Sequence, residues 1–334
     1  MKILLLKTWL TNIGNGFIDQ GAKTCIKKIF PNSEIIESSG YPNYIIFKLF
    51  QEFRNKKYMA GLKLDPMTSI GGINLLFSFK KPYSKNTSVI NVGEMVDADL
   101  VVFAGCILDF NILKLYENTL LNLKKKGLPI VFLGVGGASY DQRTVEDITK
   151  MLKKINPIAF LTRDKDAYNA YSKIFLNSYD GIDCGFFLND WYTPPKSSES
   201  FIAATFDRAN KPKIESERMI VRLTHTPFFY PFEIDSEKID FNNSNLFFSD
   251  DIKDYLFFYK NAEEVHTDRI HACVASICYN TKFRLYYKTV RSGILEKLTN
   301  DKNYDHFIIV NQEKLKKEKQ NLLDALKTMI EKIY

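Results

Sequence analysis

The stretch LPIVFLGVGGASYDQRTVEDITKMLKKIN, residues 128–156, decides the fold class. It begins as an apolar run of strand length, passes through a glycine turn at 134–137, and continues as a helical segment. The same order of strand, small or polar turn and helix recurs at 2–30, 98–127 and 158–171. Strands that alternate with helices predict a doubly wound parallel sheet, so we expect a Rossmann-like α/β domain over residues 1–190.

The rest of the chain predicts a second unit. Residues 191–215 begin with the Pro- and Ser-rich sequence WYTPPKSSES and are interpreted as a linker. Residues 216–334 again alternate between strand-like and helical segments, with expected strands in KFRLYYK and HFIIV and a long amphipathic terminal helix. Residues 41–93 lack a clear pattern and are interpreted as an insertion.

The composition is that of a globular protein: 45% of the 334 residues are hydrophobic and 25% are charged. The net charge of +7 comes mostly from scattered lysines, which favours solvated helix faces over a patch for an anionic partner and excludes a nucleic-acid-binding stripe. Five cysteines without CxxC spacing predict neither a disulfide framework nor a metal site. No apolar run is long enough to span a bilayer and no signal sequence is visible, so we expect a cytoplasmic protein. We also expect neither a metal nor another cofactor.

Ligands of doubly wound sheets bind beyond the carboxyl ends of the strands. The turns at those ends supply candidate site residues: Asn12, Gly14 and Asn15; Gly105 within 104–106; Gly136 and Gly137 within 134–137; and Arg163 and Asp164 within 162–164. None of these turns completes a GxGxxG fingerprint, and no P-loop is present. The arginine is either a solvated residue beside a helix cap or a bidentate ligand for a carboxylate or phosphate.

The segment VHTDRIHACVAS, residues 265–276, carries the strongest local pattern. Asp268 or Thr267 is expected to cap a helix, with Arg269 and His271 in its first turn, where the helix dipole favours an anion. The histidine is either packed at a domain interface or placed for chemistry, with a pKa that the helix end lowers unless a bound phosphate restores its proton. His266 is a plausible neighbour, whereas His225 and His306 are interpreted as incidental.

In this order the motifs resemble those of the polysaccharide pyruvyl transferase family. The resemblance rests on the loop TNIGNG, the strand ends VVFAGCIL and GVG, the turn TRD, Asp183 ahead of Phe186, the element TDRIHA, and Tyr287 with Lys288. Two positions depart from the family pattern: Asn15 replaces an aspartate, and Cys106 occupies a turn that is usually glycine.

The resemblance implies two Rossmann-like domains of the GT-B type with an active site in the interdomain cleft. It also implies transfer of a pyruvyl group from phosphoenolpyruvate to a sugar or lipid-linked glycan as a ketal, in surface polysaccharide synthesis. His271 is then the general acid. Arg163, Arg269, Asn15 and Gly14 bind the donor, and Asn12, Gly105, Gly136, Gly137, Asp164, Asp183 and Lys288 line the cleft.

Two alternatives stay open because Asn15 cannot act as a base. One is a GT-B glycosyltransferase that uses a nucleotide sugar, and the other is a non-catalytic member that binds an anionic glycan. No nucleic-acid partner and no transmembrane segment are expected, whereas peripheral membrane contact through a lipid-linked acceptor is compatible with the sequence.

Overall fold

The computed structural model describes residues 1–8, 12–40, 91–105, 107–207, 212–226, 245–299 and 303–332. Cys106 and all but the last three residues of the insertion expected at 41–93 lie outside the described residues.

The first domain is built on a parallel sheet with the strand order β2-β1-β3-β4-β5-β6. Its strands are β1 (Lys2–Lys7), β2 (Glu34–Ser39), β3 (Leu100–Ala104), β4 (Ile130–Val135), β5 (Ala159–Thr162) and β6 (Ser178–Asp180). Its helices are α1 (Ile13–Ile29), α5 (Val92–Met95), α6 (Phe110–Lys125), α7 (Gln142–Ile155) and α8 (Lys165–Tyr171), with a short 3₁₀ helix η1 (Ser172–Ile174). The doubly wound parallel sheet predicted from the strand–helix alternation is confirmed.

Alternate side chains of the strands serve two cores, as the period of two in a strand requires. Leu4 and Leu6 of β1 lie in the core covered by α6 and α7. Ile3 and Leu5 lie on the opposite face, in the core that α1 covers. Both faces of β1 are therefore buried, which explains its continuous apolar sequence.

The second domain holds another parallel sheet with the order β11-β10-β7-β8-β9. Its strands are β7 (Phe201–Thr205), β8 (Met219–Leu223), β9 (Leu246–Phe247), β10 (Val265–Thr267) and β11 (Phe283–Leu285). Its helices are α11 (Ile252–Asn261), α12 (Ile270–Cys278), the 3₁₀ helix η4 (Val290–Ser292) and α13 (Gly293–Thr299). Between the two sheets lie the 3₁₀ helix η2 (Cys184–Phe187) and α9 (Leu188–Trp191).

Two expectations need correction here. The segment 191–215 is not all linker, because β7 lies inside it and pairs with both β8 and β10. The Pro- and Ser-rich start of that segment hid the apolar run FIAAT that follows it. The strand expected in HFIIV is also absent from the described sheets: Ile308 forms only an isolated antiparallel bridge with Phe283.

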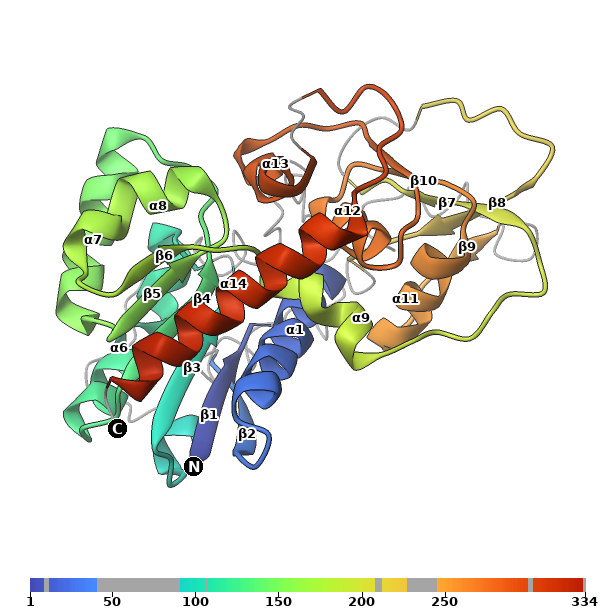
Figure 1. Cartoon of the computed structure of the whole chain (residues 1–334). Coiled ribbons are helices and arrows are strands. Elements are labelled where there is room, and N and C mark those ends of the chain that lie inside the picture. Colours follow the sequence, from blue (N-terminus) through green and yellow to red (C-terminus); the bar gives the residue numbers. More distant parts are fainter. Residues whose placement is uncertain are drawn as a thin grey trace, which may run out of the picture.

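The two domains share one apolar core. The cluster beneath α1 continues through Phe186 of η2 to Val274 of α12 without a break. The terminal helix α14 (Gln312–Glu331) runs diagonally from the second domain across the first (Figure 1) and places Leu322 and Leu326 in the same cluster. A continuous apolar interface of this kind holds the domains in a defined relative position.

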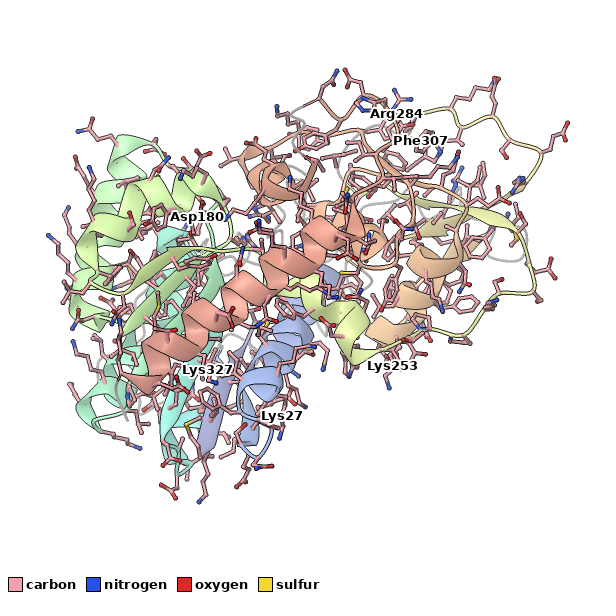
Figure 2. The ribbon with its side chains drawn as sticks, viewed as in Figure 1. Lys27, Asp180, Lys253, Arg284, Phe307 and Lys327 are labelled. Carbon is pink, nitrogen blue, oxygen red and sulfur yellow. The ribbon has the colours of Figure 1, made fainter. Side chains whose placement is uncertain are left out.

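The lysines lie mainly on solvated helix faces. Lys27 on α1, Lys253 on α11 and Lys327 on α14 are exposed (Figure 2). No helix in the described ranges combines the length and the apolar composition that crossing a bilayer requires.

Candidate active site

A small cavity lies where the carboxyl ends of the two sheets meet. The turns that follow β1 and β5 form one side, and those that follow β8, β10 and β11 form the other. The cavity is lined by Asn12, Asn15, Arg163, His225, Asp268, Arg269, Ile270, His271, Arg291 and Ile294. Its volume is about 30 Å³, which leaves room for small polar groups. A larger ligand must therefore extend out of the cavity or separate its walls.

A buried ion pair forms the floor on the first-domain side. Arg163 follows β5, and its Nη1 donates to Oδ2 of Asp183 at 2.8 Å, with both side chains at most 1% exposed. The other carboxylate oxygen of Asp183 accepts from the backbone N–H of Gly185 at 2.7 Å. Burial alone would raise the pKa of Asp183, but His271, Arg163 and this N–H outweigh it and lower the pKa to about 2. The carboxylate is therefore ionised at neutral pH.

His271 brings the second domain to this pair. Its Nε2 lies 3.6 Å from Oδ2 of Asp183, and its side chain is 15% exposed. Burial lowers the pKa of His271, and repulsion from Arg163 and Arg291 adds to that effect, while Asp183 opposes it. These effects together favour a neutral imidazole.

Gly14, at the start of α1, packs against the other side of the imidazole. A Cβ atom at position 14 would lie 2.7 Å from Nδ1 of His271, closer than atoms pack. The helix begins here because Oδ1 of Asn12 accepts from the N–H of Gly14 at 2.8 Å. The first N–H of the helix, that of Ile13, donates to the carbonyl of His225 at 2.8 Å. The N-terminus of α1 is thus fixed directly against the second domain.

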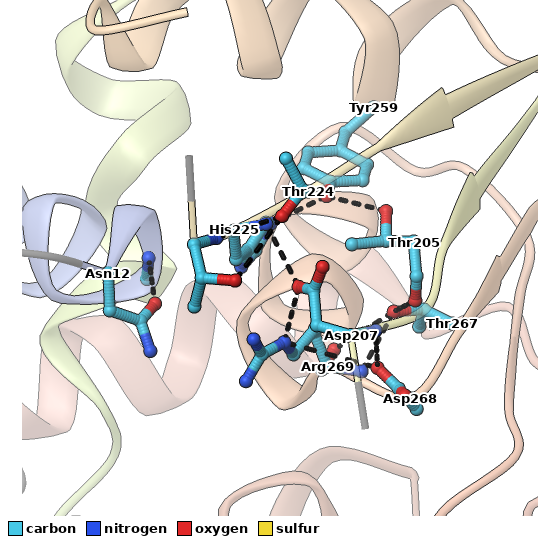
Figure 3. A network of polar contacts seen from close by, with 11 residues as sticks. Asn12, Thr205, Asp207, Thr224, His225, Tyr259, Thr267, Asp268 and Arg269 are labelled. Carbon is cyan, nitrogen blue, oxygen red and sulfur yellow. Dashed lines mark hydrogen bonds and ion pairs between the residues drawn. The ribbon is translucent and has the colours of Figure 1, made fainter. Parts of the chain in front are cut away.

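Arg269 is held by a second buried carboxylate. Its Nε donates to Oδ2 of Asp207 at 2.6 Å, and its terminal nitrogens point toward the side of Asn12 (Figure 3). Asp207 also accepts from the backbone N–H of His225 at 2.9 Å. Burial would raise the pKa of Asp207, but Arg269 and His225 lower it.

The helix cap expected beside Arg269 is different in the structure. Arg269 itself is the N-cap residue of α12, without a side-chain cap. Thr267 accepts from the N–H of Arg269 at 2.8 Å, and Asp268 accepts from the N–H of Asp207 at 3.1 Å. These side chains fix the turn and the loop beyond β7 instead of capping α12.

His225 lies at the cavity although the sequence interpretation treated it as incidental. Its Nε2 lies 2.6 Å from the hydroxyl of Tyr259, which in turn lies 2.9 Å from Oγ1 of Thr205 (Figure 3). Burial lowers its pKa to about 3, so the imidazole is neutral. Sequence reasoning also missed Asp207, which lies in the supposed linker, and Arg291. The position of His225 directly after β8 was the pattern that could have found it.

Several residues predicted for the cleft lie behind the cavity and support it. Gly136 packs on Arg163: a Cβ there would lie 2.6 Å from Nε of that side chain. The N–H of Gly136 donates to the carbonyl of Gly105 at 3.1 Å. Tyr140 joins the N–H of Gly137 to the carboxylate of Asp164, which also caps α8. Lys288 is exposed and lies outside the cavity lining.

Within the part of the chain that the structure describes, no group of His, Cys, Asp or Glu side chains is arranged to hold a metal ion. The converging groups are instead arginines and histidines, the side chains that bind carboxylates and phosphates and transfer protons.

Two Rossmann-like domains with a cationic cavity between their strand ends define a protein of the GT-B type. The chain belongs to the polysaccharide pyruvyl transferase family, whose model matches residues 12–287. The GT-B-like fold and the family resemblance expected from the sequence are confirmed.

Similar solved structures include a Listeria monocytogenes protein assigned as a UDP-N-acetylglucosamine 2-epimerase, with a TM-score of 0.50 and 12% identity over 98% of this chain and 89% of that one. A UDP-N-acetylglucosamine 2-epimerase from Rickettsia bellii gives a TM-score of 0.47 and 14% identity over 99% of this chain and 97% of that one. No curated protein sequence matches the chain significantly. At these identities the likeness concerns the fold.

Proposed function

We propose that this protein transfers the pyruvyl group of phosphoenolpyruvate to a pair of sugar hydroxyls, forming a ketal in surface glycan synthesis in the cytoplasm. Family membership supports a transferase of this kind. The observation that carries the proposal is the meeting of His271 with the Arg163–Asp183 pair at the interdomain cavity, beside Arg269 and Arg291.

The reaction needs an acid that can protonate a carbon atom. The methylene carbon of phosphoenolpyruvate takes a proton, and the central carbon becomes an oxocarbenium ion to which an acceptor hydroxyl bonds. Cleavage of the bond from that carbon to the phosphate oxygen then releases phosphate, and the second hydroxyl closes the ketal. Of the two hydroxyl protons, one replaces the proton given to the methyl group and the other leaves with phosphate.

His271 suits the role of that acid. Burial and the nearby arginines lower its pKa, but a phosphate and a carboxylate bound beside it would offset those arginines and favour the imidazolium. The ionised Asp183 further stabilises this cation. Once it has given its proton to carbon, the neutral imidazole can accept the proton of the attacking hydroxyl. One histidine can therefore act as acid and then as base.

This dual use accounts for the missing aspartate at position 15. The Nδ2 of Asn15 donates to the carbonyl of Thr8 at 3.3 Å, and its side chain lines the cavity as a neutral group. An amide there can hydrogen-bond an acceptor or the donor without adding a negative charge beside them.

Arg163 and Arg269, the two arginines expected to bind the donor, are both buried, and this limits how they can bind it. Arg163 and Arg269 are each bound to an aspartate, so part of their hydrogen-bonding capacity is already used. A guanidinium has five N–H donors, and in each of these two arginines the carboxylate behind it holds the plane of those donors in a fixed orientation toward the donor.

The test is incubation of the protein with phosphoenolpyruvate and candidate glycans, with release of inorganic phosphate and the mass of the glycan as readouts. We expect phosphate release that depends on the acceptor, a product heavier by one pyruvyl ketal, and loss of both in His271→Ala. The matched control is His306→Ala, an exposed histidine that does not line the cavity. Activity with a nucleotide sugar but none with phosphoenolpyruvate would replace this proposal with a glycosyl transfer.

A further inference from the structure

Of the three arginines that line the cavity, two are paired with a buried aspartate. Arg163 is neutralised by Asp183 at 2.8 Å, and Arg269 by Asp207 at 2.6 Å. Arg291 lines the same cavity, but among the described residues its guanidinium forms no salt bridge or hydrogen bond. Asp268 also lines the cavity, 4.0 Å from Nε of Arg269, so Arg291 is the lining arginine that has no carboxylate partner among the described residues.

The backbone that carries Arg291 is held firmly while its side chain is half-buried. The N–H of Thr289 donates to Oγ of Ser292 at 3.0 Å, and the N–H of Ser292 donates back to the carbonyl of Thr289 at 2.9 Å. Ser292 is buried, and the following Ile294 is a buried wall of the cavity. This arrangement fixes the starting point of the arginine without occupying its guanidinium.

The element also touches the first domain. A Cβ at Gly293 would make an ordinary contact of 3.4 Å with Cβ of Asp164, and Nζ of Lys297 on α13 lies 3.1 Å from the carbonyl of Gly181. Arg291 thus lies at the seam between the domains, on the same side as the turn that carries Arg163.

We propose that Arg291 is the principal anion-binding residue of the cavity, which takes a carboxylate or phosphate group of the donor between the two aspartate-bound arginines. This inference rests on the proposed function for the identity of the donor, phosphoenolpyruvate, and on the cavity alone for the anion. A guanidinium with all its donors available can bind an oxyanion through two hydrogen bonds. Arg163 and Arg269 can do this less readily, because each already binds an aspartate.

The same contact couples donor binding to the state of His271. Arg291 is one of the cations that lower the pKa of that histidine, and an anion bound to the guanidinium cancels its field. The donor would then favour the protonated acid at the moment when it is needed.

The experiment compares the full chain with Arg291→Gln and Arg291→Lys by calorimetric titration with phosphoenolpyruvate, inorganic phosphate and pyruvate separately. The control is Arg143→Gln, an exposed arginine on α7 outside the cavity lining. We expect Arg291→Gln to weaken phosphoenolpyruvate binding by about tenfold or more, Arg291→Lys to recover part of the loss, and the control to bind like the wild type. The probe that loses most, phosphate or pyruvate, identifies the group that Arg291 holds.

The outcomes separate the two proposals. Unchanged phosphoenolpyruvate binding in Arg291→Gln overturns the role of Arg291 even where transfer is demonstrated. Binding of phosphate or pyruvate that depends on Arg291, in a protein that forms no ketal, supports the anion site and counts against the proposed function. A wild-type protein that binds none of the three probes overturns both. If Arg291→Gln does not fold, as judged by thermal melting, the Arg291→Lys titration decides alone: affinities equal to the wild type overturn the proposal.

Discussion

The Nε2 atom of His271 lies 3.6 Å from Oδ2 of Asp183, and this contact joins the two domains at the candidate site. The same oxygen accepts from Nη1 of Arg163 at 2.8 Å. One carboxylate from the first domain therefore orients a first-domain arginine and a second-domain histidine together. The histidine can work as proposed only when the domains are packed as observed.

Replacement of Asp183 by Asn is expected to reduce both activity and stability. The pKa of His271 falls further without the carboxylate, and a fall of one in the pKa makes the protonated fraction at neutral pH about tenfold smaller. Loss of one partner from a buried ion pair also costs about 3–5 kcal/mol, because the charge of Arg163 stays buried. Phosphate-release assays and thermal melting measure the two effects.

The matched control for that prediction is Asp147→Asn. This aspartate pairs with Lys150 on the solvated face of α7, with side chains 36% and 70% exposed. Surface pairs contribute about 0–1 kcal/mol, so the control should melt and react like the wild type. Equal effects of the two substitutions would contradict the role given to Asp183.

The pH dependence of the reaction should follow His271. The charged or titratable groups that act on it are Asp183, Arg163, Arg291 and His225, and their balance together with burial lowers its pKa. Because the protonated form is the active acid, kcat/KM for phosphoenolpyruvate should rise as pH falls from about 8 to about 6.

The profile of kcat should bend at a higher pH than that of kcat/KM, since kcat reports the complex in which the bound anion offsets the arginines. Steady-state rates across the pH range, at saturating and at low donor concentration, measure both profiles. A kcat/KM that instead falls as the solution is acidified over this range would exclude His271 as the acid.

Gly14→Ala should displace the imidazole. The added Cβ would lie 2.7 Å from Nδ1 and 3.0 Å from Cβ of His271, so the ring or the start of α1 must move. We expect kcat to fall by about 10²-fold, because a displacement of a catalytic group by about 1 Å has an effect of that size. Gly293→Ala is the control, since its Cβ would make an ordinary 3.4 Å contact. Full activity of Gly14→Ala would show that close packing on His271 is dispensable.

His225 should make the protein sensitive to acid. Burial lowers its pKa to about 3 in the folded state from an ordinary value of 6.5. Folding favours the neutral form of His225. Its contribution to the free energy of unfolding is therefore complete above pH 6.5 and is lost as pH falls toward about 3. At about pH 5 the loss amounts to about 2 kcal/mol.

Denaturant unfolding of the wild type and His225→Gln at several pH values tests this sign. The wild type should lose more stability than the variant between about pH 7 and about pH 5, whatever the difference between the two at neutral pH. Parallel curves for the two proteins would mean that His225 does not titrate on unfolding in this range.

Much of the first domain was predictable because its central strands are buried on both faces. LVVFA and IVFLGV are continuous apolar runs that end in small or polar residues, and the structure places Gly105, Gly136 and Arg163 at one edge of the sheet, as expected. The start of the second domain was not predictable in the same way. FIAAT follows directly on a Pro- and Ser-rich segment, so β7 was assigned to the linker and Asp207 was overlooked.

The sequence by itself determined the parallel α/β architecture, the edge of the sheet that carries the candidate site, and the choice of Arg269 and His271 as candidates for that site. Local apolar periodicity and strand-end chemistry are enough for these, because they depend on residues close together in the chain. Only the tertiary structure decided that Asp183 binds Arg163, that Asp207 binds Arg269, that His225 shares the cavity, and that Arg291 lines it without an ion pair among the described residues. Charge compensation depends on distances between side chains far apart in the sequence, and those distances are set when the two domains pack.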